Sequence, residues 1–185
     1  MLPSTWNSED CCNQLVLSTD SMVAEYKGHW KHSYTQALVR SNCPMPPQCG
    51  LFYWEVNLKF RCPNSSITVG ICPRTSRLEG FNYYYDDHWC YNTHTGTVDC
   101  RSRKDREFGP KFFMGDTIGC GINFKTKSIF FTMNGELLGI AFESVPLRYP
   151  LYPFVALNNP GDRVEINFGV RAFKFDVLKY IKSYS

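Results

Sequence analysis

Residues 115–142 constrain the fold most, because three short apolar runs are separated there by two turn signals. The runs are rich in aromatic and β-branched side chains, as strands are, and they cover residues 118–124, 129–133 and 137–142. Asn134-Gly135 joins the last two runs, and both residues tolerate the positive φ that a two-residue type I′ hairpin turn requires. The sequence therefore predicts a three-stranded antiparallel meander.

Residues 51–60 give a second strand signal, because apolar side chains recur there at every second position. One face of this strand would carry Phe52, Trp54, Val56, Leu58 and Phe60, and the other Tyr53, Glu55, Asn57 and Lys59. The pattern predicts a strand with one buried face and one solvated face.

Other segments are assigned from shorter patterns. Strand-like runs occur at residues 15–17, 22–26, 37–40, 67–72, 88–91 and 164–168. Less regular segments are predicted to be an arm at residues 1–14, a solvated loop at residues 93–107, and a short helix or packed tail at residues 172–181. About a dozen short strands separated by turns, with no convincing internal helix, predict an all-β antiparallel β-sandwich.

Composition limits the classes of function. A chain of 185 residues with 43% hydrophobic residues is expected to form a single domain with a substantial core. A net charge of +3 is too small to indicate binding to nucleic acid or to an anionic membrane. Residues 101–106 are basic, but they are interleaved with acids and are interpreted as a solvated loop, with a nucleic-acid patch as the alternative. No apolar run reaches the roughly 18 residues that a membrane span needs.

The nine cysteines indicate a reducing compartment. An odd number cannot all pair within the chain, and no C-x-x-C spacing suggests a zinc ribbon or finger. Free thiols are therefore expected rather than a disulfide framework. Residues 1–10 lack the basic and apolar regions of a signal peptide, although a mature secreted chain would look the same.

Catalytic motifs are absent from the sequence, which contains no G-x-S-x-G, no H-E-x-x-H and no phosphate loop. Two weaker arrangements stay open. In the first, a cysteine hydrolase, Cys90 would be a thiolate with His88 or His94 as the nearby base. In the second, a metal site, both histidines would act as ligands together with Asp86 and Asp87. Solvated loop residues are the favoured interpretation, so we expect no enzyme activity, no cofactor and no metal.

Several segments, taken in order, carry a family resemblance. Residues 50–56, 69–71, 115–121, 131–135, 151–155 and 164–169 resemble a SPRY domain. Within that superfamily the chain is similar to the Ran-binding-protein-M group, with further matches at Leu2-Pro3, Trp6 and residues 26–28, 108–110, 138–142 and 173–176. The resemblance covers nearly the whole chain, and the order and spacing of the motifs are more specific than any one of them.

The resemblance implies a bent two-sheet, concanavalin-like jelly-roll sandwich with short terminal extensions. Residues 44–169 would form the SPRY core, residues 1–43 an N-terminal extension with the first strands, and residues 170–185 a tail. It also implies a non-enzymatic module that grips short peptides and serves as a substrate-recognition or scaffold part of a CTLH-type ubiquitin-ligase assembly, in the cytoplasm and nucleus. Alternatives are a stand-alone secreted parasite effector and a glycan-binding sandwich that uses Tyr85 with Asp86.

Three loops hold the candidate binding residues. Prolines in residues 40–47 reduce the entropy lost on docking, aromatic residues in 78–85 offer contact area, and amides in 157–162 can pair with a peptide backbone. In relatives such loops form one shallow pocket, which here would contain Asn42, Pro44, Met45, Leu78, Phe81, Leu157, Asn158 and Asn159. Packing beneath the loops is the alternative for Phe81 and Leu157, whereas Trp54, Trp89 and Tyr91 are expected in the core.

Overall fold

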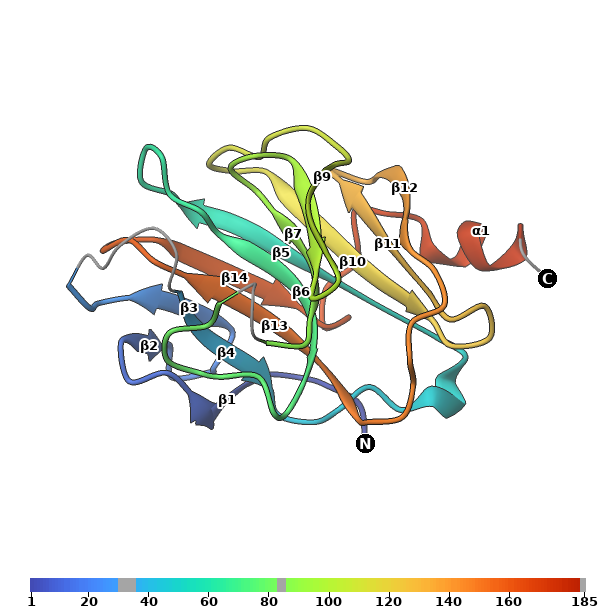
Figure 1. Ribbon diagram of the computed structural model, residues 1–185, viewed down its shortest axis with the longest axis horizontal. Coiled ribbons are helices and arrows are strands. Elements are labelled where there is room, and N and C mark those ends of the chain that lie inside the picture. Colours follow the sequence, from blue (N-terminus) through green and yellow to red (C-terminus); the bar gives the residue numbers. More distant parts are fainter. Residues whose placement is uncertain (30–35, 83–85, 184–185) are drawn as a thin grey trace.

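The computed structural model describes residues 1–29, 36–82 and 86–183, and in these residues it forms two antiparallel seven-stranded sheets stacked face to face (Figure 1). The first sheet contains, in spatial order, β1 (Trp6–Cys11), β4 (Ala37–Ser41), β13 (Leu151–Leu157), β6 (Thr68–Pro73), β7 (Trp89–Asn92), β8 (Thr97–Cys100) and β9 (Arg103–Glu107). The second contains β12 (Glu136–Phe142), β11 (Ser128–Met133), β10 (Thr117–Asn123), β5 (Leu51–Phe60), β14 (Arg163–Asn167), β3 (Val23–Tyr26) and β2 (Leu15–Leu17).

Helical structure in the described residues is limited to the single 3-10 turn η1 (Pro47–Cys49) and the short α1 (Val177–Lys182). The all-β sandwich predicted from the sequence is therefore confirmed. No helix in this part of the chain is both long enough and apolar enough to cross a membrane. All nine cysteines are described, and none is bonded to another.

The predicted meander is present as β10, β11 and β12. Its tight turn has the expected backbone, since φ is 50° at Asn134 and 93° at Gly135. Asn134 also supports the neighbouring loop, because its Oδ1 accepts a hydrogen bond from the Thr117 amide at 2.9 Å. The turn thus fixes the register of the hairpin and ties it to the start of β10.

Two segments contain strands where the sequence predicted none. Residues 93–107 hold β8 and β9 rather than a solvated loop, and residues 1–14, predicted as an arm, hold β1. β1 and β9 are the edge strands of the first sheet. An edge strand exposed to water needs no continuous apolar face, so alternation of apolar and polar residues does not reveal it.

The middle of β5 is buried on both faces, which corrects the prediction of a solvated second face. Trp54, Val56 and Leu58 enter the core between the sheets as expected. Tyr53 and Glu55, on the opposite face, are covered by the C-terminal segment, whose rings make a small cluster of Tyr53, Phe130, Phe175 and Tyr180.

Glu55 anchors this C-terminal segment to the sheet. Its carboxylate accepts hydrogen bonds from the backbone amides of Lys174 and Phe175, each at 3.1 Å, and from the Tyr53 hydroxyl at 2.9 Å. A carboxylate can be buried at low cost only when its oxygens are satisfied in this way. The tail and the sheet are therefore held together by polar as well as apolar contacts.

Glu55→Gln is expected to lower the free energy of unfolding by about 1–3 kcal/mol, because the new amide nitrogen would face a backbone donor and leave it unsatisfied. Urea denaturation gives this loss, and hydrogen exchange should show faster opening of the amides of residues 174–175. The matched control is Glu25→Gln, which breaks a partly exposed ion pair with Lys27. Equal losses in the two variants would contradict the anchoring role.

The outer face of the first sheet is also covered. Residues 74–82 return across it, and Phe81 of this segment forms a second apolar cluster with Leu38, Cys72, Cys90, Phe154 and Ala156. Arg40, the last residue of the predicted strand at 37–40 and the first of the candidate loop at 40–47, is a buried residue of β4. This covering segment brings the second candidate loop to the sheet.

Candidate functional site

The first and third candidate loops lie at opposite ends of the first sheet. β4 and β13 run antiparallel, with Arg40 opposite Phe154 and Ala37 opposite Leu157. Residues 42–45 follow β4 and therefore lie beside the start of β13, where the Met45 amide donates to the Leu151 carbonyl at 2.9 Å. Residues 157–159 lie at the far end, so the structure does not bring the three loops into one pocket.

The second and third loops do meet, and Gln36 joins them. Its backbone pairs with that of Phe81 in both directions, at 3.0 and 3.3 Å. Its side-chain amide donates to the carbonyl of Ala156 at 3.4 Å, near the end of β13. The Leu38 amide also donates to the Leu78 carbonyl at 2.9 Å. Residues 78–81 are thereby fixed next to the residues that precede the third loop.

Four of the eight candidate side chains are buried and do not form the surface. Phe81 and Leu157 pack in the core, as the alternative interpretation held, and Met45 is also buried. Asn158 is 4% exposed and serves the fold, because its Oδ1 accepts from the Ser66 amide at 3.3 Å. The candidates that remain accessible are Asn42, Pro44, Leu78 and Asn159.

Asn42 and Pro44 occupy the other end of the sheet. The Asn42 side chain accepts from the Ser4 amide at 3.0 Å and holds the N-terminal segment. Pro44 and Met45 line a mainly apolar hollow with residues 147–150. These two candidates are therefore separate from Leu78 and Asn159.

A hollow of about 250 Å³ lies at the end of the sheet where the second and third loops meet. It is lined by Cys12, Gln14, Tyr26, Gln36, Ala37, Glu79 and Gly80. We call this hollow, together with the neighbouring Leu78 and Asn159, the loop-end surface. The sequence gives no signal that Gln14, Gln36 and Glu79 belong together, because no motif links three polar residues from separate segments.

Hydrogen bonds hold the loop-end surface in place. The Tyr26 hydroxyl donates to the Gln14 side chain at 2.5 Å. The Tyr26 backbone pairs with Asp162 at 2.9 Å and with Gly161 at 3.0 Å, which sets the third loop beside the hollow. Asp162 is itself buried and accepts from the Asn159 amide at 3.2 Å. The positions of the polar groups on this surface are thus largely fixed before any partner binds.

The interior does not offer the thiolate that a cysteine hydrolase needs. Cys90 is fully buried, and this burial raises the pKa of its thiol well above the ordinary value. Burial lowers the pKa of His88 to about 4, and its Nδ1 donates to the Asp86 carbonyl at 2.7 Å. The Nδ1 of His94 accepts from Arg61 at 2.7 Å. Cys90 is therefore a protonated core residue in this fold.

The metal alternative also lacks a geometric basis in the described residues, where no three His, Cys, Asp or Glu side chains gather in a suitable arrangement. Tyr85, which the glycan-binding alternative requires, lies outside the described residues. Neither alternative gains support from the site geometry.

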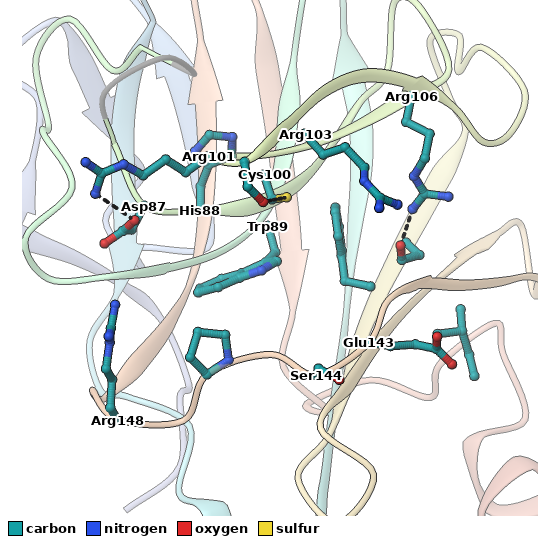
Figure 2. Close-up of a pocket in the computed structure, with 15 residues that line it drawn as sticks. Asp87, His88, Trp89, Cys100, Arg101, Arg103, Arg106, Glu143, Ser144 and Arg148 are labelled. Carbon is teal, nitrogen blue, oxygen red and sulfur yellow. Dashed lines mark hydrogen bonds and ion pairs between the residues drawn. The ribbon is translucent and has the colours of Figure 1, made fainter.

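A larger hollow, of about 990 Å³, lies between β7–β9 of the first sheet and β12 of the second (Figure 2). Four arginines line it, from β8–β9 and from the connection after β12: Arg101, Arg103, Arg106 and Arg148. We call it the arginine groove. The basic run at residues 101–106 was visible in the sequence, but its approach to Arg148 depends on how the two sheets stack.

Residues 51–171 match the family model of the SPRY domain. The chain is 38% identical over 186 residues to Ran-binding protein 9 of Xenopus tropicalis, and the match covers 98% of this chain and 33% of that protein. It is 29% identical over 168 residues to the Ran-binding protein M homolog of Arabidopsis thaliana, and this match covers 90% of this chain and 35% of that protein. The chain thus spans about a third of the length of these curated relatives.

Solved structures give the same fold. The SPRY domain of human HERC1 superposes with a TM-score of 0.74 at 20% identity, covering 90% of this chain and 99% of that one. A human SPRY domain superposes with a TM-score of 0.71 at 23% identity, covering 91% of this chain and all of the other. From the family match, the relatives and the fold together, we conclude that this chain belongs to the SPRY domain family.

Proposed function

We propose that this SPRY domain is a non-enzymatic protein-interaction module that binds a short linear segment of a partner protein at the loop-end surface. The observation that supports this most is the preformed hollow around Gln14, Gln36 and Glu79. The backbones of Gln14, Gln36 and Leu78 are held there by hydrogen bonds to Lys27, Phe81 and Leu38. A preformed surface loses little conformational entropy when a peptide docks.

The chemistry of the loop-end surface favours an amide-containing ligand. Gln14 and Asn159 carry partly exposed side-chain amides, which can both donate to and accept from a peptide backbone or an Asn side chain. The Gln36 amide is buried and bonded to Ala156 and Thr68, so it positions the loops instead. Glu79 is exposed and would repel a carboxylate. We therefore expect Asn to be preferred over Asp in the bound segment.

Within a longer protein, the domain would act as a substrate-recognition or scaffold part of a CTLH-type ubiquitin-ligase assembly, in the cytoplasm and nucleus. The similarity to Ran-binding proteins 9 and M, which are about three times as long as this chain, supports this proposal. Co-purification of a full-length protein with and without its SPRY domain would test it.

Asn159→Ala is expected to weaken binding of a library-selected peptide by about 1–3 kcal/mol, because a few contacts dominate small interfaces. The stability of the domain should change little, since the Asn159 side chain is partly exposed and its Nδ2 donates only to the adjacent Asn158 side chain, at 3.2 Å. The contact with Asp162 uses the Asn159 backbone amide and is kept. Fluorescence anisotropy measures the affinity, and thermal unfolding checks the fold.

Gln48→Ala is the matched control, because Gln48 is an exposed amide in η1, outside the residues of the loop-end surface. It should leave the affinity unchanged. The proposal fails if the two variants bind alike, or if the same sample binds glycans on an array while no peptide is selected.

A further inference from the structure

The arginine groove lies between the unpaired edges of the two sheets. β9 ends the first sheet and β12 ends the second, so neither has a partner on its outer side among the described strands. Arg106 links the two edges, because its guanidinium donates to the Ala141 carbonyl of β12 (Figure 2). The same guanidinium lies 5.7 Å from the ring centre of Phe108 and 5.9 Å from that of Phe142. The side chain of Arg106 is therefore held in place at the groove.

The charges in the groove are mostly uncompensated. The four arginines face only two acids of the lining, Asp87 and Glu143. Arg101 pairs with Asp87 at 3.2 Å, and both side chains are partly exposed. Neither Arg103 nor Arg148 forms an ion pair with any residue that the structure describes. These two exposed guanidinium groups can accept a carboxylate from a partner.

Trp89 provides an apolar surface between the charged groups. Its indole lies in the middle of the groove, with Arg101 and Arg148 on one side and Arg103 and Arg106 on the other (Figure 2). The Trp89 side chain is only partly buried, and its buried part packs against the main core. Tryptophan and arginine are the residue types that contribute most to protein interfaces.

We propose that the arginine groove is a second protein-binding site, which takes an extended acidic segment of a partner protein. Carboxylates of that segment would contact Arg103 and Arg148, and an apolar side chain between them would cover Trp89. Arginine suits this role because its planar guanidinium binds a carboxylate through two parallel hydrogen bonds. The groove shares no residue with the loop-end surface, so this proposal can be tested separately from the proposed function.

A polyphosphate chain fits the groove less well than an acidic peptide. Asp87 and Glu143 lie in the lining and would repel closely spaced phosphates. The chain as a whole carries a net charge of only +3, far below the basic surplus typical of nucleic-acid-binding domains. An acidic segment with an apolar residue can satisfy the arginines and Trp89 together.

The test uses a fluorescein-labelled peptide of sequence Gly-Glu-Asp-Leu-Asp-Glu-Gly and a second peptide in which Gln and Asn replace the acids. Anisotropy should show that the acidic peptide binds at least about tenfold more tightly at low salt. The double variant Arg103→Gln with Arg148→Gln should weaken this binding about tenfold or more. Both arginines are exposed, so unfolding temperatures should match the wild type.

The matched control is Arg163→Gln with Lys125→Gln, which removes the same charge from exposed positions outside the groove. It should change the affinity by less than about twofold. An equal loss in both double variants would show general charge attraction and overturn the proposal. So would equal binding of the two peptides, or stronger binding of a single-stranded oligonucleotide of equal charge.

Asn159→Ala serves as a further control, and it should leave binding of the acidic peptide unchanged. If it abolished this binding, the peptide would occupy the loop-end surface and the groove would not be a site. If the groove variants lost the acidic peptide while the library-selected peptide still bound, the two surfaces would be independent, as proposed.

Discussion

Arg40→Met is expected to lower the free energy of unfolding by about 3–5 kcal/mol, the usual cost of breaking a buried ion pair from one side. Arg40 is 2% exposed, and its Nε and Nη2 donate to the two carboxylate oxygens of Asp10 at 2.8 and 2.9 Å. Its Nη1 also donates to the Ser76 carbonyl at 2.8 Å. The substitution would leave Asp10 charged and buried, and would free the Ser76 carbonyl that ties the covering segment to the outer face of the sheet.

Urea denaturation measures the free energy of unfolding of Arg40→Met, and Arg163→Met is the control because Arg163 is exposed. Comparing the two variants separates the loss of the buried ion pair from a general loss of positive charge. Adding Asp10→Leu to Arg40→Met should restore part of the lost stability, because no unpaired charge then remains in the interior. A loss below about 1 kcal/mol in Arg40→Met, similar to that of a surface pair, would contradict the structural role.

Phe81→Ala is also expected to cost about 3–5 kcal/mol of stability, as truncation of a buried Phe does. Phe81 is fully buried, and its ring centre lies 5.3 Å from that of Phe154 and 5.4 Å from that of His88. The sequence left Phe81 open between a residue of the binding pocket and a residue packed beneath the loop. The structure places the ring in the second apolar cluster, so stability should change first.

Thermal and urea unfolding of Phe81→Ala measure this loss, and Phe113→Ala is the control because Phe113 is 62% exposed. The control should lose little stability. If Phe81→Ala kept its stability and lost only peptide affinity, Phe81 would be a contact residue after all, and its burial in the cluster would have to be abandoned.

Local sequence patterns predicted the strands that have a strong apolar signal. β10, β11 and β12 follow from apolar runs and from the turn at Asn134-Gly135, and β5 follows from its alternation. β1 and β9 escaped prediction because edge strands can be polar on their exposed side. The burial of Glu55 was also hidden, because the amide of Phe175 that covers it lies 120 residues away in the sequence.

The candidate site was predicted less well, for a different physical reason. Loop composition identified residues rich in proline, aromatic rings and amides, but not the end of the sheet at which each loop lies. The antiparallel pairing of β4 with β13 separates Asn42 from Asn159, and only the register of these strands reveals it. Likewise, the arginine groove depends on the stacking of two edge strands, which brings Arg148 towards Arg103.

A titration of the ¹⁵N-labelled domain with a library-selected peptide, followed by two-dimensional NMR, would locate the bound segment without any mutation. We expect the largest amide shifts at Gln14, Gln36, residues 78–80 and Asn159, while the interior strands β5 and β10 stay unchanged. The largest shifts at residues 42–49, or throughout β5 and β10, would show that partners do not bind at the loop-end surface.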